Sequence, residues 1–212
     1  MSKYKITNYF FENGAFLFAV RILKKTVNFF FNLLIFYRTD CDIDSSANLR
    51  GLKCIKIGRN FHAGKNLWLD AVTFYRGQCF NPKIIIGNNV GVQDFVHIGA
   101  TNYVEIGDNV LFASKVYVSD HNHGIYYGED QSSPIEPPFI RKLTANQEVI
   151  IGENVWVGDA VTILPGVHIG KGSIIGANSV VTRDISEFSI AVGVPARVIK
   201  KYDVAIGKWV SL

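Results

Sequence analysis

Cysteine is scarce in this chain, and none of its cysteines is placed for a disulfide framework or a metal site. The three cysteines, Cys41, Cys54 and Cys79, are odd in number and show no CxxC spacing. An odd number argues against a set of disulfides, and without CxxC the usual zinc and redox motifs are missing. We therefore expect a protein of a reducing, cytoplasmic compartment.

Uninterrupted apolar runs are also lacking, even in the N-terminal segment, where phenylalanine is frequent. Lys24 and Lys25 divide its apolar residues into runs that are too short for a membrane span. No small-residue cleavage site follows, so a secretory signal peptide is not expected either. The polar side chains fall on one helical face, at i, i+4, i+7 and i+11: Arg21, Lys25, Asn28 and Asn32. Residues 1–40 therefore predict an amphipathic helix with one basic-polar stripe.

Most of the chain lacks an excess of charge. Residues 1–40 carry six lysines and arginines against two acidic residues, whereas the other 172 residues carry 16 basic and 16 acidic groups. A nucleic-acid-binding body needs a basic surface, so we expect no nucleic-acid partner. The basic end has two open interpretations. Residues 1–38 could lie on an anionic inner membrane surface, or they could cover the open edge of the domain that follows.

What the sequence does contain is a six-residue repeat. Aliphatic residues recur at this interval in the C-terminal half, and glycine follows most of them: Ile151, Val157, Ile163, Ile169, Ile175 and Val181. Earlier members are Phe74, Phe80, Ile86, Val92 and Ile98, then Ile106, Phe112 and Val118, with Ile43, Leu49 and Ile55 as the first. Six residues match neither a helix nor an alternating strand, but they fit short strands joined by sharp corners. Three such strands complete a triangular coil of about eighteen residues, with aliphatic side chains stacked inside.

The corners of these coils carry residues that tolerate unusual backbone angles. Asn88-Asn89, Asp108-Asn109 and Glu153-Asn154 stand at the expected corner positions. The fold class is therefore mainly β, a parallel β-helix of hexapeptide repeats.

One long stretch interrupts the repeat. Residues 119–148 hold three of the six prolines, and a loop of this length inside a repeat array is usually functional. The predicted organisation is an N-terminal helical cap at 1–40, a β-helix domain at 41–201 that carries this loop, and a C-terminal tail at 202–212.

Four motifs together resemble the hexapeptide-repeat acyltransferases. They are Ile-Ile-Gly-Glu-Asn-Val-Trp-Val-Gly-Asp at 150–159, Leu-Pro-Gly-Val-His-Ile-Gly at 164–170, Ile-Ile-Gly-Ala-Asn-Ser-Val-Val-Thr-Arg-Asp at 174–184 and Gly-Val-Pro-Ala-Arg-Val-Ile-Lys at 193–200. The resemblance covers about 84–201 and is strongest to galactoside and maltose O-acetyltransferases and to acetyltransferases of lipopolysaccharide and capsule sugars. It implies a left-handed β-helix, a homotrimer with CoA between subunits, and acetyl transfer from acetyl-CoA to a sugar hydroxyl of a surface polysaccharide or its precursor.

The resemblance also implies a catalytic histidine shortly after the Ile-Gly-Asp-Asn-Val coil at 106–110. Aligned by order, this position falls on His121, with His123 as the runner-up. Both belong to Asp120-His121-Asn122-His123-Gly124, which opens the long loop. A histidine at the root of a covering loop is well placed to act as a general base on a sugar hydroxyl that attacks a thioester.

The acetyl-CoA contacts follow from the same motifs. The matching positions are Trp156, Asp159, Ala177, Thr182, Arg183, Arg197 and Lys200. Asp159 stands where relatives often carry serine, and Lys200 where they often carry arginine. Arg197 suits a bidentate phosphate contact. No metal is expected.

For the acceptor sugar, the resemblance places polar ligands about two coils before the histidine. These positions fall on Gln93 and Asp94, with His97 and Asn102 nearby. Sugar binding also uses aromatic platforms, which nearby tyrosines could supply: Tyr103, Tyr117, Tyr126 and Tyr127.

Three other functions remain open from the residues alone. A base beside a thioester groove would also serve N-acetylation of an amino sugar. A γ-class carbonic anhydrase shares this fold and holds zinc on three histidines, and His121 and His123 would point the same way if they lay in a strand. A non-catalytic β-helix that binds or assembles other molecules is the third.

Overall fold

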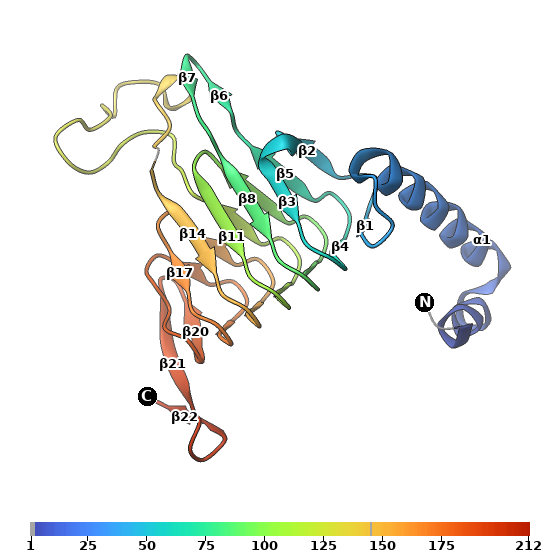
Figure 1. Ribbon diagram of the computed structural model, residues 1–212. Helices are drawn as coiled ribbons and strands as arrows, with labels where there is room; N and C mark the ends of the chain where they lie inside the picture. Colours follow the sequence, from blue (N-terminus) through green and yellow to red (C-terminus); the bar gives the residue numbers. More distant parts are fainter. Residues whose placement is uncertain (1–2, 145) are drawn as a thin grey trace.

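The computed structural model describes residues 3–144 and 146–212, with only the backbone for residues 3–10 and 13. Residues 1 and 2 of the predicted cap and residue 145 of the predicted loop lie outside the described residues. The helix α1 (Lys3–Phe36) is followed by short strands that coil around one axis. Figure 1 shows α1 projecting from one end of the coils and the C-terminal strands at the other.

Three sheets form the walls of the coils, and their coil strands pair in parallel. Sheet A contains, in spatial order, β1 (Asp42–Ile43), β4 (His62–Ala63), β9 (Gly91–Val92), β12 (Leu111–Phe112), β15 (Trp156–Val157), β18 (Ile174–Ile175), β20 (Ser189–Gly193), β21 (Ala196–Asp203) and β22 (Lys208–Ser211). Sheet B contains β2 (Asn48–Arg50), β5 (Trp68–Ala71), β10 (His97–Ala100), β13 (Tyr117–Ser119), β16 (Thr162–Ile163) and β19 (Val180–Val181). Sheet C contains β3 (Ile55–Ile57), β8 (Lys83–Ile86), β11 (Tyr103–Ile106), β14 (Glu148–Ile151) and β17 (His168–Ile169).

The register of the strands confirms the predicted β-helix. Ile151 pairs with Ile169, and Val157 pairs with Ile175, one coil further along in each case. These side chains are buried, and so is Ile43 in β1, where the repeat begins. The apolar residues of the repeat therefore form columns that fill the interior of the coils.

Asparagines hold one corner of successive coils. Asn60, Asn89, Asn109 and Asn154 have φ angles between 55° and 59°, a left-handed conformation that asparagine tolerates better than most residues. The side-chain amide of Asn60 donates to Asn89 Oδ1 at 2.9 Å, and that of Asn89 donates to Asn109 Oδ1 at 3.1 Å. The predicted corners are confirmed. Side-chain hydrogen bonds join the first three of these corners, and the Asn154 N–H joins the fourth to the Asp108 carbonyl at 2.9 Å.

The predicted repeat is wrong at Phe74 and Phe80. These residues lie in an excursion from the second coil rather than in its inward strands. Phe74 begins β6 (Phe74–Tyr75), which pairs antiparallel with β7 (Gln78–Cys79), and its side chain is 61% exposed. Arg76 and Gly77 have positive φ and make the hairpin turn. The interval alone does not distinguish an inward phenylalanine from an exposed one.

The interruption after β13 is present as predicted. Residues 120–144 and 146–147 leave the coils and contain a short 3-10 helix, η2 (Pro138–Ile140). Another, η1 (Leu52–Cys54), precedes β3. The loop packs on the β6–β7 hairpin, because the Leu143 N–H donates to Gln78 Oε1 at 2.8 Å and the Arg76 guanidinium lies 4.2 Å from the centre of the Phe139 ring. Figure 1 shows the hairpin and the loop together at one margin of the coils. We call this pair of segments the cover.

α1 contacts the first coil through its polar stripe. Asn32 is buried, and its amide donates to the Ile43 carbonyl at 2.9 Å while its Oδ1 accepts from the Ile43 N–H at 3.1 Å. Asn28 Oδ1 accepts from the Ser45 N–H at 2.9 Å. These amides take the place of a preceding strand, so the edge of β1 is not left open to other chains.

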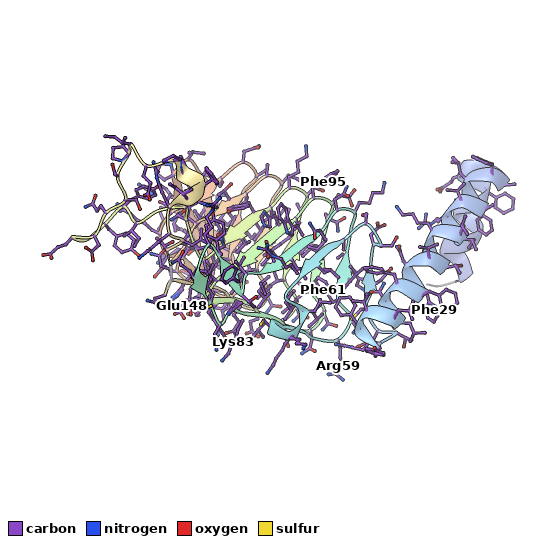
Figure 2. All side chains as sticks on the ribbon, turned by 90° about the horizontal axis from the view of Figure 1, so that it is seen from above. Phe29, Arg59, Phe61, Lys83, Phe95 and Glu148 are labelled. Carbon is purple, nitrogen blue, oxygen red and sulfur yellow. The ribbon has the colours of Figure 1, made fainter. Side chains whose placement is uncertain are left out.

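Asn28 and Asn32 of the polar stripe face the coils together with the partly buried Phe31 and Phe36, and most of the other apolar side chains of α1 face outward. The helix breaks at Gly14, where φ is 78°. Beyond this break large apolar side chains are exposed, among them Phe16, Leu23, Phe29, Phe30 and Leu34; Figure 2 shows Phe29 on the part of α1 that extends from the coils. Within the described part of the chain, no helix combines the length and the apolarity that crossing a bilayer requires.

The segment expected as a tail, 202–212, continues the structure. Its first residues complete β21, which pairs antiparallel with β20, and its last residues form β22. The rings of Tyr202 and Trp209 meet edge to face at 5.3 Å across this pair. An antiparallel hairpin carries no six-residue signature, so the repeat pattern could not reveal it.

Candidate active site

A cavity of about 340 Å³ lies between the outer face of sheet B and the cover. Alternate residues of a strand point outward, and these form its wall: Trp68, Asp70, His97, Gly99, Tyr117 and Ser119. The cover contributes Tyr75 from its hairpin and four residues from its loop: His121, Asn122, His123 and Leu143. Its volume is at the lower end of the range for small-molecule sites.

His121 lines this cavity just after β13, and its side chain is 14% exposed. Its Nδ1 lies 2.8 Å from Asp120 Oδ1 and 3.3 Å from Ser119 Oγ. The carboxylate can only accept, so Nδ1 carries the proton and Nε2 keeps its lone pair. In this tautomer the imidazole can take a proton from a hydroxyl at Nε2, as a general base must.

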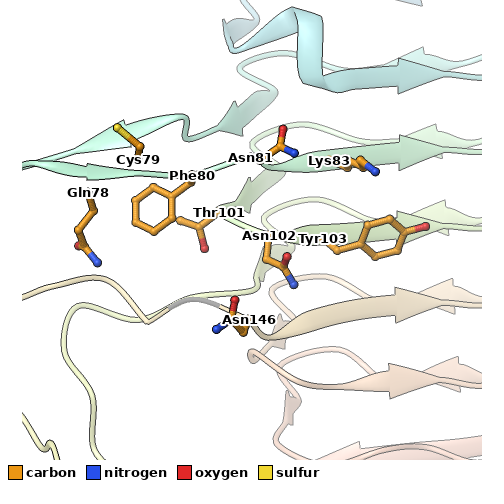
Figure 3. A pocket seen from close by; sticks show the side chains of 9 residues that line it. All are labelled: Gln78, Cys79, Phe80, Asn81, Lys83, Thr101, Asn102, Tyr103 and Asn146. Carbon is orange, nitrogen blue, oxygen red and sulfur yellow. The ribbon is translucent and has the colours of Figure 1, made fainter.

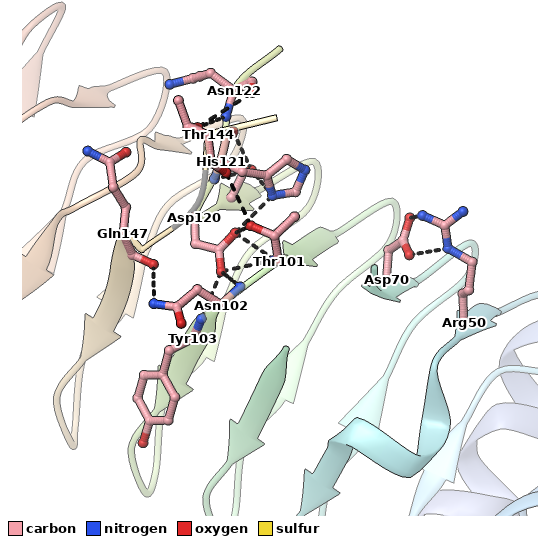
Figure 4. A network of polar contacts seen from close by, with 11 residues as sticks. Arg50, Asp70, Thr101, Asn102, Tyr103, Asp120, His121, Asn122, Thr144 and Gln147 are labelled. Atoms are coloured by element: carbon pink, nitrogen blue, oxygen red, sulfur yellow. Dashed lines mark hydrogen bonds and ion pairs between the residues drawn. The ribbon is translucent and has the colours of Figure 1, made fainter. Parts of the chain in front are cut away.

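Asp120 is fully buried, and backbone groups fix its carboxylate. Its Oδ2 accepts from the N–H groups of Asn102 at 2.7 Å and Tyr103 at 2.8 Å, and its Oδ1 accepts from the Thr101 N–H at 2.8 Å. Figure 4 shows these bonds converging on the carboxylate beneath the His121 ring. Sequence analysis did not assign Asp120 a role, although its position directly before His121 was the available signal.

His123 lies two residues further into the loop than His121 and contacts other parts of the cover. Its Nδ1 is 3.3 Å from Tyr75 Oη, and its backbone forms a bridge with Leu143. β13 ends at Ser119, so His121 and His123 do not share a strand, contrary to the premise of the zinc alternative. The Nδ1 atoms of the two histidines face different groups. Among the described residues, no three histidine, cysteine or acidic side chains lie close enough together to hold a metal ion.

His97 lies on the wall of the same cavity, with Gly99 between its ring and that of His121. Its ring stacks on Trp68 with centroids 4.2 Å apart and meets Tyr117 edge to face at 5.1 Å. Burial lowers the pKa of His97; the charge of Asp70 opposes this effect, and His121 adds to it. An added Cβ at Gly99 would lie 3.5 Å from His121 Cε1 and 3.6 Å from His97 Nε2, so glycine keeps the space between the two histidines open.

An ion pair that the sequence did not reveal closes one side of the cavity. Arg50 Nη2 donates to Asp70 Oδ2 at 2.8 Å, and Arg50 Nε bonds the other carboxylate oxygen (Figure 4). Asp70 is buried and points outward from β5, one coil before Gly99. No feature of the sequence distinguishes Asp70 from the acidic residues that stand at the corners of the coils.

The other predicted acceptor residues lie outside this cavity. Gln93 and Asp94 belong to the corner after β9, where Asp94 Oδ1 accepts from the Lys65 N–H at 2.7 Å. The Asn102 amide donates to the Gln147 carbonyl at 2.9 Å. Of the four predicted residues, the structure brings His97 to His121, and the roles of the other three stay predictions.

Asn102 lines a larger cavity, of about 620 Å³, which Figure 3 shows beside β7. Amides dominate its lining, together with Phe80 and Tyr103. The lining contains no histidine, the commonest general base, and no carboxylate; its titratable side chains are Cys79, Lys83 and Tyr103. The smaller cavity at His121 is therefore the better candidate.

Three of the predicted acetyl-CoA residues lie around one corner of the fifth and sixth coils. Asp159 and Ala177 stack in the corner between sheets A and B, where the Asp159 carbonyl accepts from the Asn178 N–H at 2.8 Å. Trp156 precedes this corner in β15 and is exposed. The Asp159 carboxylate accepts from the Ser114 N–H at 3.0 Å, which gives it a structural role at the corner.

The other four lie nearer the C-terminal end of the coils. Thr182 and Arg183 follow β19, which is two strands beyond β13 in sheet B, or about 10 Å along the axis. Arg197 and Lys200 belong to β21, opposite Val192 and Ile190. Three cationic side chains thus lie at the C-terminal end, away from the cavity.

Comparisons with known proteins agree with this architecture. The family described as "Bacterial transferase hexapeptide (six repeats)" matches residues 148–183. WbbJ of Escherichia coli K12, named as a lipopolysaccharide biosynthesis O-acetyl transferase, is 43% identical over 176 residues, which are 82% of this chain and 86% of that protein. The galactoside O-acetyltransferase of the same organism is 37% identical over 143 residues, 65% of this chain and 62% of that protein.

A solved structure shares the fold as well. The maltose O-acetyltransferase of Clostridium difficile 630 superposes with a TM-score of 0.54 at 31% identity, over 72% of each chain. The repeat, the coils and these likenesses agree. The chain belongs to the hexapeptide-repeat acetyltransferase family.

Proposed function

We propose that this acetyltransferase moves an acetyl group from acetyl-CoA to a sugar hydroxyl of a surface polysaccharide or its lipid-linked precursor. The observation that carries the proposal is the Asp120–His121 pair at the wall of the cavity, with Nδ1 held at 2.8 Å and Nε2 left to accept a proton. The acceptor class rests on the relatives, whose names mention lipopolysaccharide, galactoside and maltose.

The proposed reaction is a direct transfer within a ternary complex. Bound acetyl-CoA supplies an acyl group activated as a thioester. His121 Nε2 takes the proton of the sugar hydroxyl as its oxygen forms the new bond to the carbonyl carbon, and it returns that proton to the sulfur when the carbon–sulfur bond breaks. Asp120 keeps the ring in the required tautomer and stabilises its positive charge in between. General base catalysis of this kind contributes roughly 10²–10⁴-fold in rate.

The predicted donor contacts suit the chemistry of CoA. Arg183, Arg197 and Lys200 are cations suited to its phosphates, and Thr182 precedes Arg183 directly after β19 of sheet B. Trp156, Asp159 and Ala177 would line the pantetheine arm along the neighbouring corner. Neighbouring strands are about 4.8 Å apart, so the distance along the coil axis from these donor residues to His121 is short. An extended molecule such as CoA could therefore reach from the donor residues to His121.

The family resemblance further supports a homotrimer with CoA between subunits, and we propose that assembly for this chain. We also propose a cytoplasmic enzyme that touches the inner membrane surface through residues 1–38. The exposed phenylalanines and leucines of α1 support this contact.

The direct test compares acetyl transfer by the wild-type protein and His121→Ala. A suitable acceptor panel contains glucose, galactose and rhamnose, each as the methyl glycoside and as a linear trisaccharide, with products identified by mass spectrometry. We expect His121→Ala to lose at least 100-fold in kcat while its affinity for acetyl-CoA, measured by calorimetry, stays nearly unchanged. Near-normal turnover would refute His121 as the base, and His123→Ala then tests the alternative residue.

A further inference from the structure

Trp68, His97 and Tyr117 form a column of ring contacts on sheet B. A second cavity lies on the other side of this column from the cavity at His121. Its volume is about 320 Å³, and it shares Trp68 and His97 with the cavity at His121. The rest of its lining comes from Asn48, the first residue of β2, and from the corner between sheets A and B: Ser46, Asn66, Phe95 and Val96. The stacked rings of Trp68 and His97 therefore form a wall common to both cavities.

Phe95 is an unusual residue for its position in this corner. Its φ is 61°, and its side chain is 54% exposed; Figure 2 shows it at the margin of the coils. The equivalent corner residues of the neighbouring coils are left-handed as well: Asn66 one coil earlier, then Lys115, Ala160 and Asn178 in the three coils that follow. None of these four residues is aromatic. Asparagine adopts this conformation at lower cost than a bulky aromatic residue, and it would expose less apolar surface. An exposed aromatic side chain on an unfavourable left-handed backbone beside a cavity points to a binding role.

The chemistry of the lining identifies the class of ligand. The side-chain amides of Asn48 and Asn66 can bond sugar hydroxyls, while Phe95 and Trp68 offer apolar ring surface. Ser46 Oγ already donates to Asp44 Oδ1 and accepts from the Asn66 N–H, so it can offer a sugar only a further acceptor position. No lysine, arginine or carboxylate lines this cavity, so a phosphate or another strongly charged group would find no partner there.

We propose that this cavity is a second sugar subsite, so that the acceptor is an oligosaccharide of at least two residues that crosses the Trp68–His97 wall. The sugar that receives the acetyl group lies at His121, and the next residue of the glycan contacts Phe95, Asn48 and Asn66. This inference rests on the proposed sugar O-acetyltransferase activity and specifies its substrate as a chain rather than a free monosaccharide.

The test compares a methyl glycoside with the linear trisaccharide of the same sugar, for whichever sugar of the panel above the wild-type protein acetylates. We expect the wild type to show at least a tenfold higher kcat/KM for the trisaccharide. Phe95→Asn should lose at least tenfold on the trisaccharide and keep its kcat/KM for the glycoside. Because asparagine suits this backbone, Phe95→Asn is expected to fold, and Asn48→Ala probes the same subsite without changing a corner.

Phe188→Asn is the matched control, since Phe188 also has a left-handed backbone, with φ 53°, and lines neither cavity. Equal kcat/KM values for glycoside and trisaccharide in the wild type would overturn the proposal. So would a Phe95→Asn protein that loses both activities equally or changes its oligomeric mass in light scattering, because Phe95 would then serve contact between copies. Absence of transfer to every member of the panel would instead count against the proposed function itself.

Discussion

The Asp120 carboxylate accepts hydrogen bonds from the backbone N–H groups of residues 101–103 and also from His121 Nδ1, whose ring it orients. Both functions require an acceptor at each of its two oxygens. In Asp120→Asn one oxygen remains to accept hydrogen bonds, but the amide nitrogen faces either the backbone N–H groups or His121 Nδ1. The ring would then lose its preferred tautomer. We expect kcat to fall roughly 10²–10⁴-fold, as for the loss of general base catalysis, with little change in the KM for acetyl-CoA.

The control for this variant is Asp108→Asn. Asp108 also accepts a backbone N–H, from Asn88 at 2.7 Å, but it lies at an exposed corner away from the cavity. Steady-state kinetics on both variants checks the prediction. An equal, small effect of the two substitutions would reduce Asp120 to a structural role.

His97 predicts a pH dependence of stability. Burial lowers the pKa of His97 below 6.5 in the folded protein, so between the lowered value and 6.5 the unfolded chain binds more protons than the folded chain. Stability therefore falls as the pH drops through this window. We expect His97→Gln to lose less stability than the wild type between about pH 7.5 and pH 5.5, by urea unfolding. His62→Gln, at an exposed position of β4, is the control substitution.

Single residues differ in how far the sequence could reveal them. The place of His121 beside a cavity could be expected because it opens the long loop, whereas its role as the base stays a prediction. Asp70 and Arg50 were not, since their pairing depends on stacking β2 beside β5, twenty residues apart in the chain. The sequence also placed Gln93 and Asp94 near the acceptor, but within this chain the corner turns them away from the cavity.

At the scale of elements, Asn32 joins α1 to β1 through two hydrogen bonds. Asn32→Leu would leave the N–H and carbonyl of Ile43 without their partners in a buried position. Each such group costs about 1–3 kcal/mol, so we expect the free energy of unfolding to fall by about 2 kcal/mol or more. Thr26→Leu is the control, because Thr26 is exposed on the same helix and bonds only the Ile22 carbonyl. Urea titration followed by circular dichroism measures both, and an Asn32→Leu protein as stable as Thr26→Leu would contradict the capping role.

The outward face of α1 predicts binding to anionic vesicles. Leu34 is 71% exposed, and Phe30 is also exposed on this face. Burying each such side chain in a bilayer contributes about 1.5–3 kcal/mol, so Phe30→Ser with Leu34→Ser should weaken binding at least 100-fold. Flotation of the full chain with vesicles of phosphatidylglycerol and phosphatidylcholine checks this. Ile206→Ser with Val204→Ser, two exposed positions near the other end, should float like the wild type; flotation by the α1 variant would show that another surface binds.

The elements also show where sequence patterns reach their limit. Six-residue spacing identified the strands because every inward position must be apolar. The same spacing misassigned Phe74 and Phe80, since it registers an apolar residue and not its environment. The polar stripe of α1 was recognised, but only the contacts of Asn28 and Asn32 reveal that these two residues face the coils and leave most of the apolar side outward.

At the scale of the whole molecule, charge and sites are arranged along the coil axis. Predicted donor residues lie towards the C-terminal end, the two cavities of sheet B lie nearer the N-terminal end, and α1 continues from that end. Asn28 binds the backbone next to Ser46, which lines the second cavity. A glycan carried on a membrane lipid could therefore approach from the side of α1 while the donor occupies the opposite end.

A homotrimer with shared sites makes a prediction that only the whole assembly can fulfil. If CoA lies between subunits, His121 of one copy can work with Arg197 of its neighbour. His121→Ala and Arg197→Ala chains, each nearly inactive at low acetyl-CoA when expressed alone, should regain a substantial part of wild-type activity when they are co-expressed and purified as mixed trimers through two different tags. Mixing the separately purified proteins without subunit exchange is the control. If mixed trimers stay as inactive as the single variants, His121 and Arg197 serve the same site from one chain, and the groove between copies does not hold the donor.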